Sequence, residues 1–131
     1  MSVVLALLAP VGLGVFGNWG AFRDPDRCYA IARPVVSTRG QGFASVADWP
    51  RRGLRASVHL RLSTLRSRAS DVTLTVGERR FRLVAGDRDA WAADAASDRA
   101  IVAAMRSGRA MSVEAVGARG RPFADTYALA G

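Results

Sequence analysis

The sequence predicts an all-β protein, an antiparallel β-sandwich with one short helix at about Asp98 to Ser107. Three observations support this fold class. Apolar and polar residues alternate with a period of two along most of the chain, which is typical of half-buried strands. Turn-forming residues recur about every ten positions, and only one segment has helical spacing. A fold built from βαβ units would need a helix between each pair of parallel strands, and the sequence predicts only one helix.

The first residues look like an export signal. No charged residue lies between Met1 and Phe22, and the apolar run Val3–Leu8 is broken by Pro10. Such a run is typical of the core of a secretory signal, although the usual basic start is missing. Two alternatives remain: a membrane-spanning helix, which Pro10 and several glycines disfavour, or a first buried strand at Val11–Phe16.

We therefore expect two parts in the chain. Residues 1–15 are a signal-peptide-like or N-terminal apolar segment, and residues 16–131 form a single β-sandwich domain. A chain of 131 residues is the usual size for one domain and can bury a hydrophobic core.

The clearest strand is Leu54–Leu62, where apolar residues at even positions alternate with polar residues at odd ones. Val72–Val76 alternates in the same way, and Gly77-Glu78 then leads to a second alternating run at Phe81–Leu83, which together predict a β-hairpin. Further strands are expected at Phe16–Phe22, Cys28–Arg33, Gly42–Asp48, Ala90–Ala92, Ala110–Val116 and Pro122–Leu129.

The helix is predicted from its ends and its apolar stripe. Ser97 or Asp98 can cap the first free amides, and Gly108 supplies a stop. The apolar stripe consists of Ile101, Val102 and Met105, followed by Arg106 in the last turn.

Composition excludes several classes of protein. The single cysteine, Cys28, rules out an intrachain disulfide framework and a four-cysteine zinc module. The net charge is +8, and all 19 basic residues are arginine, which is consistent with a coding bias as well as with an anionic partner.

The arginines suggest one candidate binding surface. If the central strand and the following hairpin pair, their polar faces form a cationic stripe that could bind lipopolysaccharide, anionic lipid or an acidic protein. The residues of this predicted surface are Arg55, His59, Arg61, Arg80 and Arg82. Nucleic acid is not expected, because Phe81 alternates to the apolar side and no aromatic residue is expected to share the face of Arg55 to Arg61. A solvated strand face is the simpler alternative.

No catalytic, metal or cofactor site is predicted. The only histidine, His59, has no carboxylate near it in sequence, and Cys28 begins an apolar run that suggests a buried, inert thiol. Six aromatic residues that occur singly at strand positions are expected to lie mostly in the core: Trp19, Trp49, Phe81, Trp91, Phe123 and Tyr127. Four aspartates before the helix are interpreted as turn and helix-start residues, with a weak cation site as the alternative: Asp87, Asp89, Asp94 and Asp98.

Several short motifs stand out along the chain: Phe16-Gly-Asn-Trp19, then Asp24 and Cys28-Tyr-Ala-Ile-Ala32, the helix end Met105-Arg-Ser-Gly108, and the closing Asp125-Thr-Tyr-Ala-Leu-Ala-Gly131. Together they resemble the invasion-associated locus B family. The family often has further cysteines where this chain has Phe22, Arg23 and Asp89-Ala-Trp91, so Cys28 resembles the survivor of a lost pair.

The resemblance implies an immunoglobulin-like β-sandwich in the periplasm or outer envelope of a Gram-negative bacterium, and for the founding members a part in host-cell invasion. The function we expect is therefore non-catalytic surface recognition or an accessory envelope role, without a cofactor and without a transmembrane span. A hydrolase or transferase with an unrecognised site, or a purely structural domain, are the alternatives.

Overall fold

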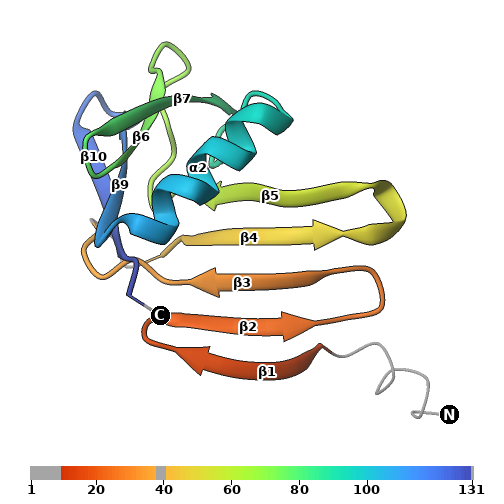
Figure 1. Cartoon of the computed structure of the whole chain (residues 1–131). Coiled ribbons are helices and arrows are strands. Elements are labelled where there is room, and N and C mark those ends of the chain that lie inside the picture. The colour runs from red at the N-terminus through yellow and green to blue at the C-terminus, as the bar shows by residue number, and fades with distance from the viewer. Residues whose placement is uncertain (1–9, 38–40, 131) are drawn as a thin grey trace, which may run out of the picture.

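The computed structural model describes residues 10–37 and 41–130 of the chain. It contains ten antiparallel strands and one α-helix (Figure 1), which confirms the predicted all-β fold with one short helix. The apolar run Val3–Leu8 lies outside the described residues. The elements are β1 Val11–Phe16, β2 Trp19–Arg23, β3 Cys28–Ala32, β4 Phe43–Trp49, the 3-10 turn η1 Pro50–Arg52, β5 Leu54–Arg61, β6 Val72–Val76, β7 Arg79–Ala85, β8 Asp89–Trp91, α2 Ala95–Ser107, β9 Ala110–Val116 and β10 Pro122–Ala128.

The strands form one continuous hydrogen-bonded sheet in the order β1-β2-β3-β4-β5-β8-β7-β6-β9-β10. Strands β1 to β5 make one layer, and β6, β7, β9 and β10 turn away from it, with α2 beside β5 (Figure 1). Two long-range contacts tie the layers together. The Trp19 indole Nε1 donates to the carbonyl of Ala128 at 2.8 Å, and Val36 forms an isolated antiparallel bridge to Thr126 of β10.

A row of buried large and small side chains crosses the first layer on its core side. Cross-strand pairing places five buried residues side by side in the order Trp19, Ala32, Ala44, Leu60 and Ala90. The small alanines on both sides of Leu60 leave room for the second layer and α2 to approach the sheet. All five residues belong to one core cluster, together with apolar residues of β6, β9 and β10.

Two predicted strands are corrected by the structure. The expected strand Phe16–Phe22 is instead a hairpin, because Gly17 adopts a left-handed conformation with φ 62° and turns the chain between β1 and β2. The alternative of a first buried strand at Val11–Phe16 gives the right conformation but the wrong burial: Val15 is 80% exposed.

The alternation of β5 also fails at its start. Ala56 has a positive φ of 53°, and its N–H donates to the Asp48 carboxylate at 2.7 Å. This bulge breaks the register between β4 and β5, so Leu54 is 46% exposed instead of facing the core. From Val58 onward the predicted alternation is confirmed, as it is in β6 and β7.

The helix begins three residues earlier than the sequence predicts. Its cap is Asp94, whose side chain accepts a hydrogen bond from the Ser97 N–H at 2.7 Å. This hydrogen bond lowers the pKa of Asp94. The predicted caps are therefore wrong, although the stop at Gly108 is confirmed: a β-carbon there would lie 3.1 Å from both Ala104 O and Leu129 Cδ1.

Asp98 serves the sheet rather than the helix end. Its carboxylate accepts the backbone N–H of Val58 at 2.8 Å, on the edge of β5 that the short strand β8 leaves uncovered. Desolvation raises the pKa of Asp98; the hydrogen bond from Val58 opposes the rise, and the nearby charge of Asp94 adds to it.

Removing this acceptor should destabilise the fold. We expect Asp98→Ala to lower the free energy of unfolding by about 1–3 kcal/mol, because the N–H of Val58 would be left without a partner. Asp98→Asn keeps a carbonyl oxygen in place and should lose less than half as much. Urea unfolding at neutral pH measures both variants. Equal losses in the two would show that the carboxylate does not act through this hydrogen bond.

A fully buried carboxylate, that of Asp125, lies inside the core. Asp125 on β10 is fully buried and accepts two hydrogen bonds from Ser63, one from the backbone N–H at 2.9 Å and one from the hydroxyl. Burial raises the pKa of Asp125, and the Ser63 bonds oppose that rise. Burial also raises the pKa of the neighbouring Tyr127, with the charge of Asp125 as a further cause.

Within the described ranges, the helix is too short and too polar to cross a bilayer.

Candidate functional site

The best candidate site is the face of β2 to β5 and β8 that points away from α2, which we call the outer face. Every residue that these strands contribute to the core cluster lies on the opposite, helix side. The outer face is therefore not used for packing the two layers together. It carries two groups of aromatic and charged residues, one at each end of the strands.

The first group, the His59 cluster, consists of Phe43, His59, Arg61, Asp89 and Trp91. His59 Nε2 lies 2.8 Å from one oxygen of Asp89, and Arg61 Nη1 donates to the other oxygen at 2.7 Å. The His59 ring stacks on Trp91 at 5.5 Å and meets Phe43 edge-on at 5.2 Å. Asp89 thus orients the His59 imidazole and the Arg61 guanidinium beside two aromatic rings.

The second group, the Arg27 cluster, consists of Phe22, Arg27, Tyr29, Trp49 and Arg52. The Arg27 guanidinium lies 4.0 Å from the centre of the Tyr29 ring and 5.1 Å from that of Trp49, and Arg52 lies 4.9 Å from Trp49. Phe22 stacks on Tyr29 at 5.5 Å. These cation–π contacts hold two positive charges over aromatic rings at the surface.

Asp24 fixes Arg27 in this position. Although desolvation opposes it, the pKa of Asp24 is lowered, because the carboxylate accepts the backbone N–H groups of Asp26 and Arg27 and the Arg27 side chain at 3.2 Å. These bonds close the turn between β2 and β3, and this turn places the Arg27 side chain on the candidate surface.

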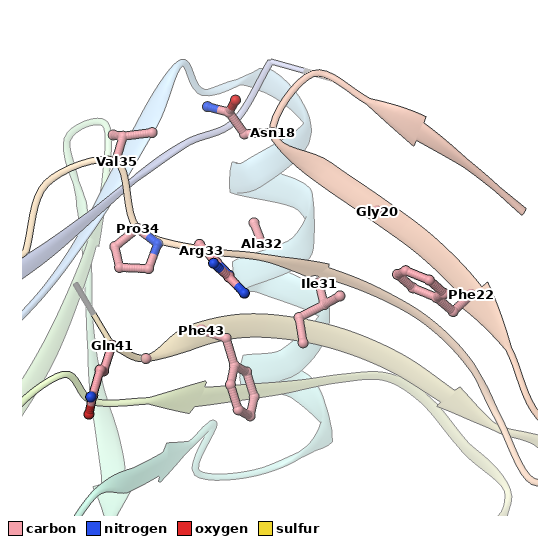
Figure 2. Close-up of a pocket in the computed structure, with 11 residues that line it drawn as sticks. Asn18, Gly20, Phe22, Ile31, Ala32, Arg33, Pro34, Val35, Gln41 and Phe43 are labelled. Carbon is pink, nitrogen blue, oxygen red and sulfur yellow. The ribbon is translucent and has the colours of Figure 1, made fainter. Parts of the chain in front are cut away.

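A hollow of about 900 Å³ lies between the two clusters. Figure 2 shows Phe22, Ile31 and Phe43 on the side of the strands away from the helix, with Arg33 and Pro34 above them. Its floor is mainly apolar, and its rim includes one guanidinium. The hollow connects the rings of both clusters, so an elongated ligand could contact both ends of the outer face.

The five residues of the predicted cationic surface do not form one stripe. Strand β8 lies between β5 and β7, so the expected pairing of the central strand with the hairpin does not occur. Arg55 lies beyond the bulge at the far end of β5 from Arg61, and Arg82 forms an exposed ion pair with Asp71 at 2.9 Å. Arg80 lines a separate hollow on the second layer with Glu114. Only His59 and Arg61 are brought together.

Two further expectations about this face are wrong. Neighbouring strands bring Phe43 opposite Arg61 and Trp91 opposite His59, so aromatic residues do share the cationic face. Trp91 is also 42% exposed, not a core residue, whereas Trp19, Phe123 and Tyr127 are buried as expected. The rings of Phe43 and Trp91 come from β4 and β8, the two strands that pair with β5.

The structure also changes the interpretation of His59 and Cys28. His59 does have a carboxylate partner, supplied by Asp89 from 30 positions further along the chain. Cys28 is exposed, not buried, and pairs with Asp48 at the opposite end of the sheet from His59. Among the described residues, the side-chain hydrogen-bond partner found for His59 is the Asp89 carboxylate.

The aspartates before the helix do not converge on one point. Asp89 binds His59 and Arg61, Asp94 caps the helix, and Asp98 binds the N–H of Val58. In the part of the chain that the structure describes, no three histidine, cysteine or acidic residues are grouped as a metal site.

Comparison with protein-family models, with curated proteins and with solved structures found no match to this chain. Its function is therefore inferred from the positions of these residues.

Proposed function

We propose that the protein is a non-catalytic recognition domain of the bacterial envelope, of the invasion-associated locus B type, and that its outer face binds an anionic saccharide such as lipopolysaccharide. The observation that supports this most is the pairing of one exposed and four half-buried rings with arginines on a face that the core cluster does not use. Flat aromatic surfaces contact sugar rings, and guanidinium groups pair with phosphates. The net charge of +8 favours approach to an anionic surface.

The binding test compares two aromatic truncations. Trp91→Ala should weaken binding to lipopolysaccharide micelles by about tenfold or more, since loss of one ring contact is worth about 1–3 kcal/mol. Phe16→Ala removes a ring of similar exposure from β1, outside both clusters, and should leave binding within about twofold. Titration monitored by light scattering or calorimetry measures both. Equal weakening in the two variants would contradict the assignment to the outer face.

The same titration should be repeated with a single-stranded RNA oligonucleotide as the alternative ligand. An open sheet that interleaves rings with arginines is also typical of single-strand nucleic-acid binding. The export signal expected from the sequence favours an envelope ligand instead. Binding of the RNA without binding of lipopolysaccharide would overturn the proposal.

Export is tested separately from binding. Fusion of the first 25 residues to alkaline phosphatase, an enzyme active only after export, should give activity in a Gram-negative host. An inactive fusion that stays in the cytoplasm would contradict the envelope location. A matched fusion with Leu5→Arg and Leu8→Arg, which interrupts the apolar run, should lose the activity.

A further inference from the structure

A second cationic feature lies away from the outer face. Three loops meet at one end of the fold: the connection from β5 to β6, the turn from β7 to β8 and the hairpin from β9 to β10. Between them is a hollow of about 570 Å³, lined by Thr64, Leu65, Arg88, Gly117, Ala118, Arg119, Arg121, Pro122 and Phe123. None of these residues belongs to the His59 or Arg27 cluster.

The loops around this hollow are tied to one another by backbone hydrogen bonds. The Leu62 N–H donates to the carbonyl of Arg88 at 2.6 Å, and the Ala118 N–H donates to Leu65 at 2.8 Å. Gly117 donates to Arg121 at 2.8 Å and closes the hairpin turn. The backbone positions that carry the arginines are thus fixed by the fold before any ligand arrives.

Three arginines line this hollow, and no carboxylate is among its lining residues. None of Arg88, Arg119 and Arg121 takes part in an ion pair within the described residues. Asp87, which precedes Arg88 in the sequence, lines an adjoining hollow together with Arg66 and Arg68. Five arginines therefore surround two neighbouring hollows with one carboxylate, an excess of like charge that a bound anion would relieve.

Arg66 holds its place without an acidic partner. Its guanidinium donates to five backbone carbonyls, the shortest being Ser70 at 2.7 Å and Gly86 at 2.9 Å. These bonds join the β5–β6 and β7–β8 connections while leaving the charge of Arg66 uncompensated. The role of Arg66 in the structure is to organise these loops.

We propose that the hollow formed by Arg88, Arg119 and Arg121 is a binding site for a phosphate group. Guanidinium groups match the geometry of phosphate oxygens with paired N–H donors, and three of them from two separate turns can surround one tetrahedral anion. The apolar side of the hollow, formed by Leu65 and Phe123, suits the organic part of a phosphate ester. The phosphate can come from a small soluble ester or from a lipid headgroup.

The test uses inorganic phosphate and matched charge variants of the full chain. Wild-type protein should bind phosphate in calorimetric or NMR titration, and Arg119→Ser with Arg121→Ser should weaken it at least about tenfold. Arg99→Ser with Arg109→Ser removes the same charge from α2 and the residue before β9, and should change binding less than about twofold. Equal weakening in both double variants, or no saturable binding by the wild type, would overturn the site.

A second arm identifies the source of the phosphate. Vesicles of phosphatidylcholine with phosphatidic acid should retain the wild type more than the Arg119→Ser/Arg121→Ser variant if the site takes a lipid headgroup. Equal retention combined with a loss of soluble phosphate binding assigns the site to small esters. Trp91→Ala should leave phosphate binding unchanged, so failure of the outer-face proposal and failure of this one are distinguishable. Loss of phosphate binding in Trp91→Ala would contradict a separate site.

Discussion

Replacing Asp125 by alanine is expected to lower the free energy of unfolding by about 2–4 kcal/mol. The carboxylate accepts both the N–H and the hydroxyl of Ser63, and both residues are buried. Without it, two buried donors lose their acceptor, each at a cost of about 1–3 kcal/mol, partly offset because a carboxylate no longer has to be desolvated. Urea unfolding with circular dichroism measures the loss.

Asp125→Asn separates the hydrogen bonds from the charge. The asparagine carbonyl can accept the Ser63 N–H while its amide donates to the Ser63 hydroxyl, so both contacts persist without a buried charge. This variant should lose less than half as much stability as Asp125→Ala at pH 7. If the two variants were equally destabilised, the charge itself, not the pairing with Ser63, would be what the core requires.

The difference in folding stability between wild type and Asp125→Asn should depend on pH, and the direction of this dependence can be predicted. Burial raises the pKa of Asp125 above its ordinary value of 3.8. The folded state therefore holds this proton more tightly than the unfolded state, and the stability of the wild type falls as pH rises from about 3.8 through the raised pKa. Asp98, whose pKa is also raised, is present in both proteins and cancels. The stability of wild type relative to Asp125→Asn should therefore decrease with pH across this range; an increase would contradict the raised pKa.

The fold could be predicted from the sequence because alternation reports burial directly. The strands β6, β9 and β10 begin where the pattern places them, and the hairpin between β6 and β7 turns at Gly77 and Glu78 as expected. Alternation identifies the two sides of each strand. It does not identify which strands are neighbours, and this limit explains the errors at the candidate site.

The partners of His59 illustrate this limit. Asp89 and Trp91 reach it only because β8 inserts between β5 and β7 after the β6–β7 hairpin has left the layer. No local pattern distinguishes that arrangement from direct pairing of β5 with the hairpin. The same limit applies to the hollow lined by Arg88, Arg119 and Arg121. These residues come from two turns, and they lie close together only because backbone hydrogen bonds join three loops. Turn composition predicted the loops but not their contacts.

Leu60→Ala should destabilise the fold by about 4 kcal/mol, near the upper end for a truncation of this kind. Leu60 is fully buried between Ala44 and Ala90 in the cross-strand row, and neither alanine can extend to fill the space that the larger side chain leaves. The cost of a cavity is highest where the surroundings cannot collapse. The measurement is the midpoint and slope of urea unfolding.

Leu54→Ala is the matched control on the same strand. Strict alternation would place Leu54 on the core side with Leu60, but the bulge at Ala56 leaves Leu54 46% exposed. Its truncation should cost less than about 1 kcal/mol, because little apolar surface is returned to water. A loss similar to that of Leu60→Ala would mean that β5 alternates without interruption. Arg55 would then project beside Ser57, His59 and Arg61, and the cationic face expected from the sequence would extend along the whole strand. The stability of one exposed leucine thus tests both the bulge and the shape of the proposed binding surface.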